Sequence, residues 1–448
     1  MKSVVLGPVL RPGEAGYAAE CTGFNLLVEH RPAVVVGATC AADVQAAVEY
    51  ASSNGLQIGV VCTGHQPFDP VRGSMMINTG RMGDVEVNPT NATVHVGAGA
   101  RWQDVVDRAA RHDLAPLCGS SPGVAVAGYV LGGGLSPFLG RTFGWAADHV
   151  LSLQVATADG CLREVSADSD PDLFWALRGG KSNFGVVTAL QLALFPVKEF
   201  FGGGLYYAGD STAVVLQAYR DLTDEAPEEM NSSVALLRLP PLPSVPEPLR
   251  GKLVVHVRIA YIGDPEEGAR LVAPLRQVAP RVIDDVGLRS FREFAAVHQE
   301  PTDPMPYEER STLLEKLTPE AVDLLVEAAG PKSGCTVTIV DIRHLGGALA
   351  RPPAIANAVG NRDAGFVVWG AAVGTHEVNA APLERIETLI ERLSAWGTGL
   401  KYLNFISGHD GAELAYAPHT YQRLRELKKV FDPDNTFSQN NHNIPPAA

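Results

Sequence analysis

Residues 118–148, CGSSPGVAVAGYVLGGGLSPFLGRTFGWAAD, decide the fold of this chain. The stretch holds eight glycines, and its apolar residues follow neither the helical period of 3.6 nor the strand period of 2. Glycines at this density mark backbone that adopts positive φ or approaches another group closely. Apolar side chains such as Val124, Val130 and Leu135 lie between them. We therefore predict a buried, irregular segment that packs against a flat cofactor or against a second subdomain.

Three familiar motifs occur only in part. Residues 119–123, GSSPG, match the G-x-S-x-G of a hydrolase, in which the residue after the serine donates its backbone N–H to an oxyanion. Here that residue is Pro122, which has no N–H, so the hydrolase is excluded. The dinucleotide fingerprint fails because Trp102 takes the place of its third glycine, and a Walker loop fails because Trp175 takes the place of its first.

The composition is that of an ordinary globular protein. The chain has 448 residues, 46% hydrophobic and 19% charged, which is enough for two or three domains. Its net charge of -14 argues against nucleic acid and anionic membranes as partners, because both need basic surface. The sequence has no signal-peptide pattern, no membrane-spanning apolar run, and no metal or disulfide spacing among its six cysteines. We expect a cytoplasmic monomer or homodimer without a metal.

A predicted strand at residues 58–62 runs directly into the turn Thr63-Gly64-His65. Such a turn leaves several backbone amides without a partner, and amides in this arrangement form a nest that binds a pyrophosphate. His65 lies at the tip of the turn. A histidine in a turn commonly forms only local hydrogen bonds, and the turn taken alone favours that interpretation.

Periodicity and turn residues predict the remaining elements. Strands are expected at residues 33–37, 75–78, 85–87, 93–97, 150–156, 162–165 and 184–194, and helices at residues 42–54, 102–112 and from Pro171 onward. Beyond residue 200 we expect strands at 252–262, 335–344 and 366–373, and helices at 212–221, 265–277, 290–298, 319–329, 383–396 and 418–431. This alternation fits an antiparallel sheet covered by helices on one face.

A series of motifs points to one family. In chain order they are ATCAADVQAAVEYA, CTGH, SSPGVAVAGYVLGGG, ADHVLSLQVATADG and DLFWALRGGKSNFGVVT, then KYLNF and DPDNTFSQNNHNI. Together they resemble the bacterial berberine-bridge-enzyme-like flavoproteins of the vanillyl-alcohol-oxidase (FAD-binding PCMH) superfamily, over about residues 25–200 and 396–446. The resemblance implies an α+β fold. Residues 1–198 would form an FAD-binding PCMH-type domain, residues 199–395 a substrate-binding domain with an antiparallel sheet flanked by helices, and residues 396–448 a return to the FAD domain.

The resemblance also implies how the cofactor is held. In the family the glycine stretch wraps FAD, and the turn histidine is joined covalently to the 8α-methyl group of the flavin. His65 takes that position. The other residues implied to contact FAD are Val61, Cys62, Thr63, Gly64, Gln66, Ser120, Ser121, Gly123, Val126, Gly128, Asp148, Val150, Gly185, Val187, Tyr402, Asn404 and Asn441.

Several positions depart from the family pattern. Many members form a second bond to the flavin from a cysteine three residues before a V-G-V segment; counting back from Val124 gives Ser121, which excludes that bond. Cys118 lies three residues further upstream and is predicted to be a small packed hydrophobe. Lys181-Ser182 and Ser136 replace glycines common in their loops. We expect local adjustment there, with FAD retained.

The C-terminal segment KYLNFIS, residues 401–407, resembles the Y-x-N-Y segment of the family. Tyr402 and Asn404 take the positions of the tyrosine and asparagine that lie at the flavin. The second tyrosine is often the catalytic base, and here Phe405 replaces it. The closing segment, which usually contacts the cofactor, holds Asn440, Asn441 and Asn443.

In the family the second domain covers the flavin and supplies the substrate pocket. Arg343, His344 and Trp369 are candidates for that pocket. A polar residue on an alternating strand more often faces solvent, so the sequence leaves their direction open.

These observations predict an FAD-dependent oxidase that uses dioxygen. An alcohol oxidase needs a base within hydrogen-bonding reach of the hydroxyl proton, and Phe405 offers none. A hydroquinone gives up protons and electrons without one. We therefore predict a small aromatic or quinonoid secondary metabolite as substrate, similar to reoxidation of a reduced antibiotic such as mitomycin in self-resistance. Two alternatives stay open: a sugar or alcohol oxidase with a relocated base, such as Tyr129 or a residue of the second domain, and a drug-sequestering flavoprotein.

Overall fold

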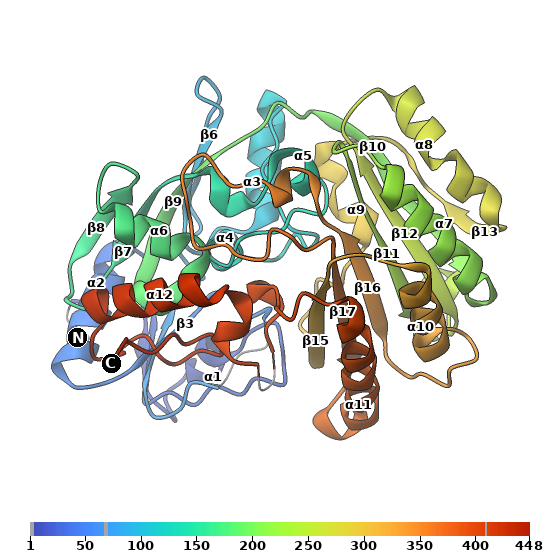
Figure 1. Ribbon diagram of the computed structural model, residues 1–448. Helices are drawn as coiled ribbons and strands as arrows, with labels where there is room; N and C mark the ends of the chain where they lie inside the picture. The colour runs from blue at the N-terminus through green and yellow to red at the C-terminus, as the bar shows by residue number, and fades with distance from the viewer. Residues whose placement is uncertain (1–3, 67–69, 408–409) are drawn as a thin grey trace.

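The protein folds into two parts, which are seen side by side in Figure 1. The computed structural model describes residues 4–66, 70–407 and 410–448. One part holds the N-terminal strands and helices together with the C-terminal segment, and the other is built on a large antiparallel sheet. The predicted α+β class is confirmed. The domain boundaries at 198/199 and 395/396 stay predictions.

The first part contains two small sheets. In the four-stranded sheet the order is β1 (Val9–Leu10), β2 (Val34–Gly37), β4 (Met75–Asn78) and β3 (Ile58–Val61). Strands β2, β4 and β3 are parallel, and helix α2 (Ala41–Ser53) makes the crossover that parallel strands require. The antiparallel five-stranded sheet has the order β5 (Val85–Asn88), β6 (Thr93–Gly97), β9 (Val186–Ala193), β7 (Val150–Ala156) and β8 (Leu162–Ser166). Helices α1 (Tyr17–Cys21), α3 (Trp102–Ala109) and α6 (Pro171–Gly180) complete this part.

The glycine-rich stretch is largely buried, but it is less irregular than its sequence indicates. It contains the short helices α4 (Val126–Leu131) and α5 (Gly140–Phe143), and neither is long enough to give a sustained helical period. Helix α4 is capped at Gly132, and the next two residues have φ angles of 109° at Gly133 and 76° at Gly134. Glycine is needed at these two positions because L side chains are strained at such angles.

The second part is an eight-stranded antiparallel sheet. Its strands follow the order β13 (Arg281–Asp284), β10 (Glu199–Ala208), β12 (Leu253–Tyr261), β11 (Met230–Arg238), β16 (Ile339–His344), β17 (Phe366–Val373) and β15 (Tyr307–Leu314), with β14 (Gly287–Ser290) paired to β10. Helices α7 (Thr212–Glu225), α8 (Pro265–Val278), α10 (Pro319–Ala329) and α11 (His376–Leu393) cover one face (Figure 1). The sheet therefore has one apolar face against these helices and a second face toward the first part.

Five strands of this sheet were not predicted: β10, β11, β15 and the short edge strands β13 and β14. Strand β10 carries three glycines, β11 is nearly buried throughout, and β15 begins with charged residues. Strands β10 and β11 do not show the alternation of a half-solvated strand, because both faces of the sheet are covered there. The predicted helix at 290–298 is also divided, into a single turn at Phe291–Glu293 and helix α9 (Ala295–His298). The helix predicted at 383–396 begins earlier, at His376.

Aromatic packing is one of the contacts between the two parts, and the C-terminal segment returns to the first part. Phe138 of the glycine-rich stretch packs edge-on against Phe294, which precedes α9, with ring centroids 5.6 Å apart. Helix α12 (Pro418–Phe431) lies along α6, so the C-terminal segment returns to the first part (Figure 1). Within the described residues, no helix is both long and apolar enough to cross a bilayer.

Candidate active site

A cavity of about 310 Å³ lies between the two parts of the chain. This is within the size range of small-molecule and cofactor sites. Its lining comes from the turn after β3, the glycine-rich stretch, the C-terminal segment and the free face of the large sheet. The predicted site residues that line it are Val61, Cys62, Thr63, Gly64, His65, Gln66, Ser120, Ser121, Gly128, Gly185, Val187, Tyr402, Asn404 and Phe405.

The turn that carries His65 is held by the segment around Phe24. The amide of Phe24 donates to the Thr63 carbonyl at 2.8 Å, and the amide of Asn25 donates to the Gly64 carbonyl at 3.1 Å. Gly64 has φ 64°, and a Cβ placed on it would lie 2.8 Å from the Cα of Gly23. Glycine at position 64 is therefore required both by the φ angle and by the close approach of the two backbones.

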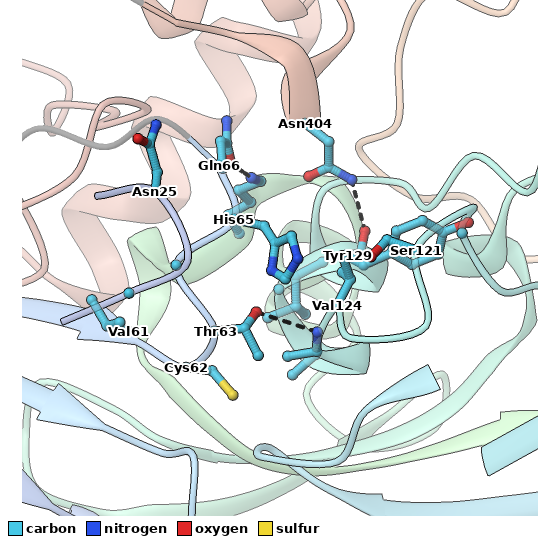
Figure 2. A pocket seen from close by; sticks show the side chains of 18 of the residues that line it. Asn25, Val61, Cys62, Thr63, His65, Gln66, Ser121, Val124, Tyr129 and Asn404 are labelled. Atoms are coloured by element: carbon cyan, nitrogen blue, oxygen red, sulfur yellow. Dashed lines mark hydrogen bonds between the residues drawn. The ribbon is translucent and has the colours of Figure 1, made fainter. Parts of the chain in front are cut away.

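The His65 ring projects into the cavity (Figure 2). The ring of Phe24 stacks on one face at a centroid distance of 3.9 Å and an interplanar angle of 11°. Both ring nitrogens of His65 are buried and unpaired among the described residues. Burial, together with the nearby Arg101 guanidinium, lowers the pKa of His65 to about 4. The imidazole is thus neutral at pH 7, with a free nitrogen lone pair.

Asn404 joins the glycine-rich stretch to the C-terminal segment. Its Nδ2 donates to the Tyr129 carbonyl and to the Tyr402 hydroxyl, both at 2.9 Å, and the first of these bonds is drawn in Figure 2. The Tyr402 hydroxyl also accepts from the Leu135 amide at 2.9 Å. A Cβ on Gly132 would lie 2.0 Å from Asn404 Oδ1, so only glycine permits this approach. The Tyr129 hydroxyl, which faces the same cavity, is buried without a partner within the described part of the chain.

Phe405 stands where the sequence resemblance predicts a catalytic base. Its ring lies edge-on to Tyr402 at a centroid distance of 5.1 Å and 6.0 Å from the Trp369 ring. The Arg343 guanidinium lies 5.5 Å from the centre of the same ring. Phe405 is therefore part of an aromatic wall, and it brings no proton-accepting group to the cavity.

The free face of the large sheet brings a carboxyl group into the cavity. Glu309 of β15 is only 4% exposed, and its Oε2 accepts from the indole Nε1 of Trp369 at 2.5 Å. Burial raises the pKa of Glu309 from 4.5 to about 7, although the Trp369 hydrogen bond and the nearby Arg343 oppose the change. The group can therefore gain or lose a proton near neutral pH.

Arg343 of β16 is fixed by a buried ionic network. Its Nε donates to Asp341 Oδ2 at 2.9 Å, and Arg258 Nη1 donates to Asp341 Oδ1 at 3.1 Å. Glu300 lies 3.6 Å from Arg343 Nη2. Arg258, Asp341 and Arg343 form a polar triad, and each of them is at most 8% exposed. Arg343 consequently keeps its charge and direction at the cavity.

Lys181, for which the sequence predicts only a local adjustment, also lines the cavity. Its ammonium lines the cavity and donates to the side-chain oxygen of Gln66, whose Nε2 donates in turn to the Leu403 and Ile406 carbonyls. Burial lowers the pKa of Lys181 from 10.5 to about 7. The cavity therefore contains a second group that titrates near neutral pH.

Five predicted cofactor residues do not line the cavity: Gly123, Val126, Asp148, Val150 and Asn441. Asp148 forms an ion pair with Arg362 at 2.6 Å, and Asn441 Nδ2 donates to the Ile406 carbonyl at 3.1 Å. Gly123 adjoins the site, since a Cβ on it would lie 3.8 Å from His65 Cε1. Their assignment to the cofactor stays a prediction.

Among the second-domain candidates, Arg343 and Trp369 line the cavity, whereas His344 does not. His344 Nε2 lies 2.9 Å from Arg141 Nη1, and its ring stacks on Phe366. The cavity residues that the sequence did not single out include Glu300, Tyr307 and Glu309. The available signal was the alternation in YEERST, which places Tyr307, Glu309 and Ser311 on one face of a strand.

Comparison with known proteins agrees with this geometry. Residues 32–166 match the FAD binding domain family, and residues 401–445 match the berberine and berberine-like family. Over 99% of this chain and 97% of its own length, (R)-6-hydroxynicotine oxidase from Paenarthrobacter nicotinovorans is 28% identical. An FAD-dependent monooxygenase from Fusarium proliferatum is 34% identical over 46% of this chain and 40% of its own length.

Solved structures of oxidases also resemble this chain over nearly its whole length. The crystal structure of 6-hydroxy-D-nicotine oxidase from Arthrobacter nicotinovorans superposes with a TM-score of 0.84 at 26% identity and covers 99% of this chain and 98% of its own. A chitooligosaccharide oxidase structure superposes with a TM-score of 0.83 at 21% identity, over 99% of this chain and 98% of its own, which supports the fold alone.

The residues of the cavity fit FAD. His65, Ser121 and Tyr129 each present a buried polar atom that lacks a partner among the described residues. Buried polar groups are normally hydrogen-bonded. Three unpaired polar atoms in one cavity therefore indicate that a ligand binds there. A Cβ on Gly128 would point into open space, which leaves the backbone of α4 accessible to a flat ligand. The turn after β3 and the glycine-rich stretch would hold the cofactor.

Proposed function

Because this chain belongs to the berberine-bridge-enzyme-like FAD-linked oxidoreductases, we propose that it is an oxidase with FAD attached to His65 that uses dioxygen to oxidise a small aromatic substrate of hydroquinone type. The bound flavin would supply the two-electron chemistry, and the protein supplies binding, orientation and electrostatics. The observation that carries the proposal is the His65 ring in the cavity, whose nitrogens have no partner among the described residues.

His65 has the properties that attachment to an electrophilic carbon requires. Attack needs a neutral imidazole with a free nitrogen, and burial keeps the pKa of His65 near 4. The backbone bonds from Phe24 and Asn25 fix the turn, and the stacked Phe24 ring restricts rotation of the imidazole. A nucleophile that is already oriented reacts faster because the entropy of alignment is lost during folding.

A single covalent bond is part of the proposal. Ser121 stands at the position of the cysteine that makes the second bond in many relatives. Cys118 is fully buried and does not line the cavity, and burial raises the pKa of its thiol well above the usual value. A thiol that stays protonated is a poor nucleophile.

Acid precipitation tests the attachment. The wild-type pellet should stay yellow, and His65→Ala should release its flavin to the supernatant. The matched control is His95→Ala, which removes an exposed histidine on β6. Peptide mapping should find one flavin-bearing peptide, and it should contain His65. A colourless wild-type pellet from yellow protein would refute the covalent bond, and flavin on the Cys118 peptide would refute the single attachment.

The aromatic wall supports a flat, ring-bearing substrate. Trp369, Phe405 and Tyr307 line the cavity on the side of the large sheet. A relative that matches along nearly the whole chain is named for 6-hydroxynicotine, a small molecule. Phe405 removes the base that oxidation of an alcohol would use at that position, which favours substrates with more acidic hydroxyl groups.

A specific observation supports a second candidate function. Glu309 is a buried carboxyl group in the cavity, and burial raises its pKa to about 7. It is therefore a candidate for the relocated base of a sugar or alcohol oxidase. Solved structures with the same fold include chitooligosaccharide and xylooligosaccharide oxidases. The sequestering flavoprotein has no comparable support.

Anaerobic flavin reduction separates these functions. We expect rapid bleaching of the flavin absorbance with hydroquinones and none with oligosaccharides or simple alcohols. Admission of air should restore the absorbance with release of hydrogen peroxide. Rapid bleaching by a sugar would establish the second candidate instead, and no bleaching with any member of the panel would favour sequestration. A role in antibiotic self-resistance, the cytoplasmic location and the oligomeric state stay predictions.

A further inference from the structure

The free face of the large sheet gathers charged side chains around the substrate side of the cavity. Side chains alternate between the two faces of a strand, so Tyr307 and Glu309 of β15 point to the same side. In the register of the sheet Glu309 pairs with Ala371, and the next residue of β17 on that face is Trp369. Both Glu309 and Trp369 line the cavity, as does Arg343.

Glu309 is oriented and has one oxygen available. Its Oε2 is occupied by the indole N–H of Trp369, and no hydrogen bond to its Oε1 is found among the described residues. The strand itself is fixed near this point, because the Ser407 hydroxyl donates to the Glu309 carbonyl. A carboxylate with one engaged oxygen and one free oxygen in a cavity is suited to accept a proton.

We propose that Glu309 is the proton acceptor of the reaction, in place of the tyrosine that Phe405 replaces, and that Arg343 stabilises the substrate oxyanion, so that the site selects small hydroxyaromatic substrates. This inference rests on the oxidase function proposed above. It assigns the missing base to the second part of the chain, on a strand that the sequence alone did not reveal, and it replaces the expectation that a hydroquinone reacts here without a base.

The proton and electron balance is simple. The substrate O–H bond breaks, a new O–H bond forms on Glu309, and the bonding electron pair stays on the substrate oxygen beside the Arg343 guanidinium. Over the whole reaction a hydroquinone loses two protons and two electrons to become a quinone. Dioxygen gains the same two protons and two electrons and leaves as hydrogen peroxide.

Acidity and shape both select a hydroxyaromatic compound. A phenol has a pKa of about 10, as in tyrosine, whereas an aliphatic hydroxyl is a far weaker acid. With the pKa of Glu309 near 7 after burial, transfer from a phenol is uphill by a factor of roughly 10³ before Arg343 contributes. The rings of Trp369 and Phe405, 6.0 Å apart, offer aromatic contacts to the substrate ring.

Several other charged groups act on Glu309. Arg343 on the neighbouring strand and Arg310 on the same strand favour the carboxylate, and Glu300 disfavours it. Tyr307 and Lys181 also interact electrostatically with Glu309. The Lys181 ammonium titrates in the same range, so a pH profile must be compared between variants rather than interpreted in isolation.

Glu309→Gln is the direct test, with Glu308→Gln as its matched control. Glu308 precedes Glu309 on β15, points to the opposite face and lies 3.4 Å from His376 Nδ1. With a hydroquinone, wild-type kcat/KM should fall as the pH drops below about 7. Glu309→Gln should lower it by roughly 10²–10⁴ and remove that acid limb, whereas Glu308→Gln should keep both rate and limb. An unchanged acid limb in Glu309→Gln would overturn the proposal.

Trp369→Phe tests the same idea without touching the carboxyl group. It removes the N–H that holds down the pKa of Glu309, so the acid limb should move to higher pH. This result is obtained even if Glu309→Gln fails to fold, which flavin content would reveal. A limb that stays in place or moves to lower pH would contradict the assignment.

A binding measurement tests the proton without turnover. 4-Nitrophenol titrated into the oxidised holoenzyme should share one proton with Glu309. Above the pKa of both groups the wild-type affinity should therefore weaken about tenfold per pH unit, because the shared proton must come from solvent. Glu309→Gln should bind the ionised probe with an affinity that is flat over this range. Identical pH dependence in the two proteins would overturn the proposal.

The outcomes distinguish this inference from the function on which it rests. If hydroquinones fail to bleach the wild-type flavin, the proposed substrate class is wrong. If they bleach wild type and Glu309→Gln at the same rate and with the same pH profile, the oxidase function stands and Glu309 is not the proton acceptor.

Discussion

The two faces of the large sheet differ sharply although the same strands build both. One row across the sheet consists of Val368, Ile342, Val234, Val257 and Leu205, and it packs against the covering helices. The adjacent row on the opposite face consists of Trp369, Asp341, Ala235, His256 and Tyr206, and its Trp369 end lines the cavity. Both rows are largely buried. Alternation therefore does not separate core from solvent here; it separates a structural core from a buried polar layer.

Burial of the polar layer has a cost in folding free energy. A buried ionic group loses its favourable hydration free energy, and the attraction to its partner offsets that loss only when the geometry is good. A buried aliphatic side chain is stabilising by itself. The triad of Arg258, Asp341 and Arg343 satisfies that condition, with both oxygens of Asp341 in use. We infer that the layer is maintained for what it does at the cavity, while the apolar face supplies the stability.

The largest expected effect comes from removing the shared carboxylate. Asp341→Ala should lower the free energy of unfolding by about 3–5 kcal/mol, because two buried guanidinium groups lose their central partner. Denaturant unfolding would measure it. Combining Asp341→Leu with Arg258→Met and Arg343→Met should recover most of the loss, since apolar groups of similar volume replace an ionic network at little cost. A triple variant as unstable as Asp341→Ala would show that the polar layer is itself a source of stability.

Glu309→Gln should give an intermediate, pH-dependent effect. The pKa of Glu309 is raised by burial from 4.5 to about 7, so between these values the folded protein holds more protons than the unfolded chain. The contribution of Glu309 to stability is present below pH 4.5 and is lost as the pH rises through about 7. Relative to wild type, Glu309→Gln should gain roughly 3 kcal/mol between pH 4.5 and pH 8. Unfolding curves at both pH values would test it, and a gain that appears on acidification would contradict the assigned pKa.

The fold of the first part could be predicted from sequence for physical reasons. Its elements are short and bounded by glycine or proline, as in α2, which ends just before Gly55, and in α6, which has Pro171 at its first turn. In the second part β10 and β11 are buried on both faces, which erases the alternation that marks a strand. Strand β15 kept its alternation, but YEERS resembles a solvated strand until the facing part of the chain is known.

The candidate site likewise contains some residues that the sequence predicts and others that it does not. His65, Tyr402 and Asn404 belong to local motifs that the sequence shows directly, and all three line the cavity. Glu309 and Arg343 reach it only through the register of strands that are distant in sequence. Lys181 was identified as a departure from the family pattern, but its contact with Gln66 depends on how two loops meet. The alternation in YEERST shows which side chains share a face with Glu309, but the cavity that this face lines depends on tertiary packing.

The smallest expected effect, on the apolar face, is the sharpest test of the division between the two faces. Ile342 lies between Asp341 and Arg343 on β16, is fully buried and points toward the helices. Ile342→Val should lower the free energy of unfolding by about 0.5–1.5 kcal/mol, because it removes one methylene group from a packed core. If the faces are separate in function, the rate of anaerobic flavin reduction and its pH dependence should match wild type, although both neighbouring residues belong to the polar triad. A shifted acid limb in Ile342→Val would mean that packing on the helix side sets the position of Arg343, and the two faces would then have to be treated as one mechanical unit.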